Sequence, residues 1–100
     1  MDKKILKQAQ QLQTKMLRTQ EELANATVEA TSGGGAVTVV MTGQQEIRSI
    51  KISPEVVDPE DVELLEDMIL AAVKEATQKS REMAEKKMGA LTGGLKIPGM

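Results

Sequence analysis

Residues 61–76, with the sequence DVELLEDMILAAVKEA, constrain the fold more than any other stretch of the chain. Written as a helix, this segment carries two neighbouring apolar stripes, whereas a helix on the surface of a domain needs only one. We therefore predict that it packs on two surfaces, the chain's own β-sheet and a second copy of the chain. Burial inside one domain is the alternative, although a chain of 100 residues holds little other apolar sequence to enclose the helix. The first stripe contains Leu65, Ile69, Ala72 and Ala76, and the second contains Leu64, Met68 and Ala71.

A long N-terminal helix is predicted over residues 2–26, where good helix formers dominate and neither glycine nor proline occurs. Apolar and small residues recur there at alternating spacings of three and four, which is the pattern of a heptad seam. Because some members are small or polar, we expect the seam to pack on a neighbouring helix and on a second copy of the chain. The seam consists of Ile5, Ala9, Leu12, Met16, Thr19, Leu23 and Ala26.

Three strands are predicted between the two helices, over residues 28–31, 36–41 and 47–52. Their connecting turns are short and contain glycine, so the strands should form an antiparallel meander. In the last strand the alternation of apolar residues slips near Ser49, which predicts a bulge or a strand with two apolar faces.

The three consecutive glycines at 33–35 could in principle cradle a phosphate group. A phosphate-binding loop of this kind would continue with lysine and then serine or threonine, at the start of a helix. Residues 36–38 are instead AVT, within a predicted strand. The glycines are therefore predicted to form a hairpin turn.

A second long helix is predicted over residues 58–88. Asp58 can cap it, Pro59 suits its first position, and Gly89 is placed to stop it. Beyond Ala76 its large apolar residues are methionines, so this half is expected to project beyond the sheet. Residues 1–88 are thus predicted to form a single domain and residues 89–100 a flexible tail.

The residues that are missing argue against catalysis. The chain has no histidine and no cysteine, so the most common general base and the usual zinc ligands are absent. Nothing resembles a signal peptide or an apolar span of about 20 residues, which predicts a cytoplasmic protein. We therefore predict that the protein is not an enzyme, that it uses no cofactor or metal, and that it has no small-molecule substrate and no membrane partner.

Charge is strongly segregated along the chain. Residues 1–20 carry five basic and one acidic side chain, residues 21–73 two basic and eleven acidic, and residues 74–100 six basic and three acidic. Two positively charged regions could thus meet in space. Ordinary solvated helix faces are the alternative.

Three segments resemble one known family. Residues 7–13 (KQAQQLQ) are followed by further matches at 15–16 and 20–23, residues 33–39 (GGGAVTV) form the second segment, and residues 64–69 (LLEDMI) with 71–72 form the third. In this order and spacing the chain resembles the YbaB/EbfC family of small bacterial nucleoid-associated DNA-binding proteins. The resemblance extends along nearly the whole chain.

The resemblance implies an α+β fold of order α-β-β-β-α that pairs into an intertwined homodimer with projecting helical arms. The arms would straddle duplex DNA with little or loose sequence preference, in the nucleoid, and affect its organisation or gene expression. It implies no cofactor and no catalytic residue. Charge and helix position suggest the DNA contacts Lys3, Lys4, Lys7, Lys15, Arg18, Lys79, Arg81, Lys86 and Lys87. Apolar pattern suggests the dimer contacts Leu12, Met16, Leu64, Leu65, Met68, Ile69 and Ala72.

A chaperone-like or adaptor protein is the alternative function. Projecting helices could hold a protein partner instead of DNA, and the methionines Met83 and Met88 would suit adaptable contacts. Suppression of the aggregation of an unfolded client, without DNA binding, would favour this second hypothesis.

Overall fold

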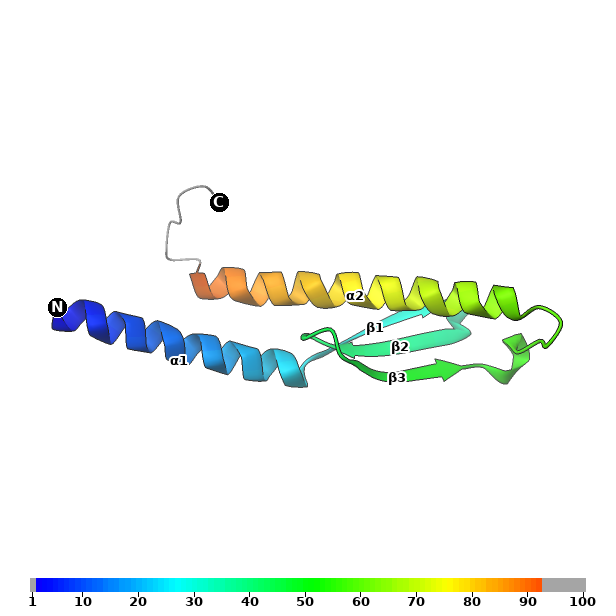
Figure 1. The fold of residues 1–100 in the computed structure, drawn as a ribbon, viewed down its shortest axis with the longest axis horizontal. Helices are drawn as coiled ribbons and strands as arrows, with labels where there is room; N and C mark the ends of the chain where they lie inside the picture. Colours follow the sequence, from blue (N-terminus) through cyan, green and yellow to red (C-terminus); the bar gives the residue numbers. More distant parts are fainter. Residues whose placement is uncertain (1, 93–100) are drawn as a thin grey trace.

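Two long helices and a three-stranded sheet make up the computed structural model, which describes residues 2–92 (Figure 1). The predicted order α-β-β-β-α is confirmed. The molecule is elongated, with extents of 69 × 26 × 17 Å, because α1 continues away from the sheet. The elements are α1 (Lys3–Asn25), β1 (Thr27–Ser32), β2 (Val37–Thr42), β3 (Ile47–Ile52) and α2 (Val62–Thr92), with short 3-10 turns at Gly33–Gly35 and Pro54–Val56.

The sheet is the predicted antiparallel meander, with strand order β1-β2-β3. Its β2–β3 pairing shifts register once, because Val40 lies opposite Ser49 whereas Met41 lies opposite Ile47. Arg48 is therefore the extra residue of a bulge, as the slip near Ser49 predicted. The bulge places Ile47 on the same side of the sheet as the other two isoleucines of β3, since all three pair with buried residues of β2.

The turn between β1 and β2 requires glycine because its backbone adopts positive φ angles. Gly33, Gly34 and Gly35 have φ angles of 61°, 69° and 93°, a region that residues with a side chain rarely adopt. The turn also closes against α2, because a Cβ atom on Gly33 would collide with the sulfur of Met68. The glycines thus form the hairpin turn that was predicted.

The core lies between α2 and the strands β1 and β2. Ala72 and Ala76 of α2 are fully buried against Val37 and Val39 of β2, and small alanine side chains let the helix approach the sheet closely. Leu65 and Ile69 are partly buried against the same core. The first predicted stripe therefore does pack on the chain's own sheet.

The second predicted stripe is only partly covered by this chain. Leu64 is 53% exposed and Ala71 is exposed, whereas Met68 is partly buried against the core. A helix with a second, open apolar stripe is what the sequence led us to expect.

Both ends of α2 differ from the prediction. The helix begins at Val62 instead of residue 58, because Asp58 closes a separate turn through its carbonyl oxygen and the amide of Asp61 (3.0 Å). Asp61 then caps the helix, since its carboxylate accepts from the amide of Leu64 at 3.3 Å. At the other end α2 runs through Gly89 to Thr92, as Gly89 does not adopt the positive φ of a helix-stopping glycine. Residues 93–100 of the predicted tail lie outside the described residues.

Helix α1 matches its predicted bounds to within one residue at each end. Asp2 caps it by accepting from the amide of Lys4 at 3.0 Å. Its C-terminal half lies beside the C-terminal half of α2, and the two helices run in opposite directions (Figure 1). The N-terminal end of α1 extends beyond the end of α2.

Candidate nucleic-acid interface

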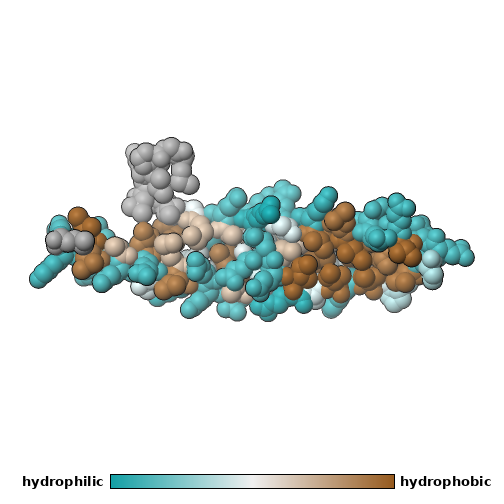
Figure 2. Space-filling model, viewed as in Figure 1, coloured by the Kyte–Doolittle hydropathy of each residue, from teal (hydrophilic) through white to brown (hydrophobic). Residues whose placement is uncertain are grey.

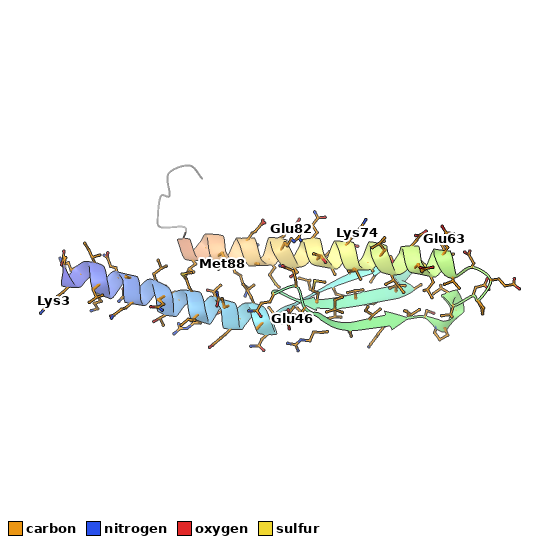
Figure 3. The ribbon with its side chains drawn as sticks, viewed as in Figure 1. Lys3, Glu46, Glu63, Lys74, Glu82 and Met88 are labelled. Atoms are coloured by element: carbon orange, nitrogen blue, oxygen red, sulfur yellow. The ribbon has the colours of Figure 1, made fainter. Side chains whose placement is uncertain are left out.

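The basic residues of α1 share one face of that helix, which we call the basic face: Lys3, Lys4, Lys7, Lys15 and Arg18. At 100° per residue, these five side chains fall within an arc of about 120°. Three of them, Lys7, Lys15 and Arg18, line a shallow depression together with Gln10, Gln11 and Thr14. All five basic residues are exposed, and Figure 3 shows Lys3 at the free end of the helix.

The basic face is open because the apolar seam lies on the opposite side of α1. Leu23 is buried against the rest of the molecule, and Leu12 lines a groove between α1 and the end of α2, with Ala90 and Leu91 on its far side. Within residues 2–92, no acidic side chain forms an ion pair with any member of the basic face. Their positive charges are therefore available to a phosphate backbone.

The four predicted DNA contacts on α2 fall into two groups. Lys79 is engaged inside the chain, since its Nζ donates to the carbonyl oxygen of Glu29 at 3.0 Å and lies 3.5 Å from the carboxylate of Glu75. Lys87 lies 3.7 Å from the carboxylate of Glu22 and so joins α2 to α1. These two lysines hold neighbouring elements together.

Arg81 and Lys86 are exposed and contact neither helix α1 nor the sheet through a hydrogen bond or ion pair within the described residues. Arg81 follows the buried Ser80 and is therefore turned about 100° away from the core. The structure thus gathers the five basic residues of α1 on one face but does not collect all nine predicted residues in one patch.

An open apolar surface lies beside α2, on strand β3. Ile47, Ile50 and Ile52 are 47%, 43% and 36% exposed although they lie on the side of the sheet that α2 covers. Helix α2 packs on β1 and β2 and leaves β3 uncovered. Val62 (53% exposed) and Val73 lie on the flank of α2 away from Lys79, which contacts β1, and so extend this surface. Figure 2 shows a broad hydrophobic region over the sheet half of the molecule.

The residues predicted to contact a second copy are spread over three environments. Met16 and Leu64 are exposed, at 38% and 53%. Leu65, Met68 and Ile69 are partly buried in the chain's own core, and Leu12 is partly buried beside α2. Ala72 is already covered by its own sheet. The isoleucines of β3 were not among the predicted contacts, although the predicted bulge in this strand was a signal that they could share one side.

The described part of the chain contains neither a membrane-spanning helix nor a metal site. Over residues 2–92, neither helix is long and apolar enough to cross a membrane. No three acidic side chains in this range are arranged to hold a metal ion.

The chain is similar in sequence to proteins of one known family. The sequence matches the YbaB/EbfC DNA-binding family over residues 1–95. It is 62% identical over 97 residues to a nucleoid-associated protein of Pelotomaculum thermopropionicum, covering 97% of this chain and 92% of that protein. It is 57% identical over 91 residues to a nucleoid-associated protein of Roseiflexus castenholzii, covering 91% and 90% of the two chains.

A solved structure supports the fold independently. The chain superposes on an uncharacterized protein from Helicobacter pylori with a TM-score of 0.81, at 19% sequence identity and covering 93% of this chain and 99% of that one. Sequence identity of 19% supports only the shared fold. Membership of a family is instead shown by the sequence matches, which extend over almost the whole chain. This chain is a member of the YbaB/EbfC DNA-binding family.

Proposed function

We propose that this protein is a homodimeric nucleoid-associated protein that binds duplex DNA through the basic face of α1, with little or loose sequence preference. The observation that carries the proposal is the open face of five cationic side chains, none of them in an ion pair within residues 2–92. Its relatives bear the name nucleoid-associated protein, which supports the same role. In this proposal the protein acts by binding, in the cytoplasm at the nucleoid, and affects nucleoid organisation and gene expression.

The dimensions of the basic face suit duplex DNA. From Lys4 to Arg18 the helix rises about 21 Å, and the major groove, about 12 Å wide, admits an α-helix. Lysine and arginine contacts to phosphates position a protein without reading sequence. Because the chain is acidic overall, with a net charge of −2, binding must depend on this local face and should weaken steeply with salt.

Dimerisation is proposed through the open apolar surface formed by Ile47, Ile50, Ile52, Val62 and Val73. A contiguous apolar surface at the exposed edge of a sheet is unfavourable in water and favours association. Of the contacts proposed from sequence, Leu65 and Ile69 lie next to this surface on α2 and are kept, as are Leu12 and Met16 on α1. Leu64 and Met68 are left out because they lie on the β1 flank of α2, opposite Val73. Ala72 is left out because its own sheet covers it.

Neutralising the basic face tests this proposal. The double variant Lys7→Gln/Arg18→Gln removes two charges from the basic face, and Lys51→Gln/Lys74→Gln removes two exposed charges elsewhere. We expect the first to weaken binding to unrelated duplexes alike and to reduce the log–log salt slope by about 1.8, at about 0.9 per lost phosphate contact. The control should leave affinity and slope unchanged. Equal effects of the two double variants would show that DNA does not bind at the basic face.

A protein partner is the second candidate function, because α1 also exposes apolar residues. Ile5, Leu6 and Leu17 are 59%, 48% and 56% exposed, which suits an unfolded or helical client. Suppression of client aggregation by a protein that does not bind DNA would favour this chaperone-like or adaptor role.

A further inference from the structure

We propose that the β2–β3 hairpin sets the direction of α1, and that Arg48 is a positioning residue for the basic face. The hairpin cap, as we call it, consists of Gly43, Gln44 and Arg48. This inference rests on the proposed DNA-binding function, because it assigns a role to residues that hold the DNA-binding helix without touching DNA.

The carbonyl groups at the end of a helix lack partners within the helix. In α1 the hairpin cap supplies partners to two of these, Leu23 and Ala24, and adds bonds to the neighbouring carbonyl oxygens of Ala26 and Gln20. The amide of Gly43 donates to the carbonyl oxygens of Leu23 at 2.9 Å and Ala26 at 3.0 Å. The guanidinium Nη2 of Arg48 donates to the carbonyl oxygen of Ala24 at 3.0 Å. The side-chain amide of Gln44 donates to the carbonyl oxygen of Gln20 at 3.1 Å.

Arg48 reaches α1 because of the bulge in β3, of which it is the extra residue. A cation at the C-terminal end of a helix is favoured by the helix dipole, and α1 has no basic residue in its own last turn. The sheet therefore provides the cation that the helix sequence lacks.

The hairpin also packs closely on α1, because Gly43 lies directly against Leu23. A Cβ atom on Gly43 would lie 2.7 Å from Cδ2 and 2.9 Å from the carbonyl oxygen of Leu23. On its other side the hairpin is joined to α2, since Ser80 Oγ donates to the carbonyl oxygen of Thr42 at 2.7 Å. The hairpin cap is thus held between both helices, with Glu46 at its turn beside the end of α1 (Figure 3).

A small change at this junction is magnified along α1. Helix α1 extends about 30 Å from Leu23 to Lys3, so a rotation of about 10° at the cap displaces its free end by about 5 Å. Phosphates of one strand follow one another about every 3.4 Å along the duplex axis, so this displacement exceeds that axial spacing. The hairpin cap therefore controls how often α1 points in the direction that binds DNA, and loosening it lowers the fraction of binding-competent molecules without changing the number of phosphates contacted once DNA is bound.

Arg48→Met tests the role of Arg48, because it keeps the aliphatic stem and removes the charge and the donors. The chain has no cysteine, so spin labels can be attached at Gln8→Cys and Lys74→Cys, with labelled chains diluted into unlabelled ones to isolate distances within a chain. We expect Arg48→Met to broaden the distance distribution between the labels and to weaken DNA binding three- to tenfold with an unchanged salt slope. Lys51→Met, in the same strand, is the matched control and should change neither quantity.

Two results would overturn the inference. An unchanged distance distribution in Arg48→Met, and in Gln44→Leu as a second and milder variant, would show that the cap does not hold α1. A salt slope reduced by about 0.9 would show that Arg48 contacts phosphate itself. The label distances are measured without DNA, so failure of the wild-type protein to bind DNA would count against the proposed function and leave the test of the hairpin cap intact.

Discussion

The hydroxyl of Ser80 donates a 2.7 Å hydrogen bond to the carbonyl oxygen of Thr42, and both residues are buried. This bond joins the middle of α2 to the end of β2. It marks the point where α2 stops covering the sheet and begins to lie beside α1. The helix that forms the core is therefore also fixed to the hairpin that holds the basic face.

Ser80→Ala removes this bond, while the carbonyl oxygen of Thr42 keeps its 3.1 Å contact from the amide of Gln45. We expect a loss of about 1 kcal/mol in the free energy of unfolding. Urea unfolding followed by far-UV circular dichroism at fixed protein concentration measures it, since the chain has no aromatic residue. The exposed variant Gln78→Ala should change stability by less than half as much. Equal stability of Ser80→Ala and the wild type would show that this bond contributes nothing.

Two glycine variants should act in opposite directions. Gly43→Ala would bring a Cβ atom within 2.9 Å of a backbone oxygen, so we expect destabilisation of about 2 kcal/mol. Gly89→Ala adds a methyl group inside a helix, at a position where no side chain of residues 2–92 lies within 4 Å, and should stabilise by about 0.5 kcal/mol. Thermal unfolding of both variants checks this. Destabilisation by Gly89→Ala would mean that α2 does not continue past that residue.

A charge introduced on the open apolar surface should prevent dimerisation, whereas a charge introduced in the core should prevent folding. Ile50→Asp lies on the open surface of β3 and is expected to give folded monomers, whereas Leu65→Asp lies against the core and should unfold the chain. Thr31→Asp, on an exposed position of β1, is the control. Sedimentation equilibrium and circular dichroism distinguish these results. A stable dimer of Ile50→Asp would rule out the proposed interface.

Lys79 and Lys7 should differ in their effect on DNA binding although both were predicted contacts. Lys79 is held by Glu29 and Glu75, and releasing it for phosphate would break both contacts. We expect Lys79→Gln to reduce affinity less than threefold, and Lys7→Gln to reduce it at least threefold. Competition binding at one salt concentration compares the two directly, and a larger effect of Lys79→Gln would place DNA on α2.

The sequence was sufficient to predict the architecture because its periodicities are strong. The stripe of Leu65, Ile69, Ala72 and Ala76 located the face of α2 that covers the sheet. The slip near Ser49 located the bulge. Helix ends were predicted less well, because Asp58 and Asp61 are both good caps and only tertiary structure selects between them.

The candidate site was only partly predictable. Spacing along α1 is enough to place Lys7, Lys15 and Arg18 on one face. Spacing could not show that Lys79 and Lys87 would be used inside the chain, since their partners Glu29 and Glu22 are distant in sequence. For the same reason the contact of Arg48 with the end of α1 was missed.

The most direct test of DNA binding through the basic face is fluorescence anisotropy of a dye-labelled duplex of about 30 base pairs, titrated with the wild-type protein at several salt concentrations. The label belongs on the DNA because the protein has no aromatic residue to report binding. We expect similar affinities for unrelated sequences and a steep log–log decrease with salt, about 0.9 for each neutralised phosphate. Absence of binding at low salt would contradict the proposed function and assign the face of Lys7, Lys15 and Arg18 to solvent.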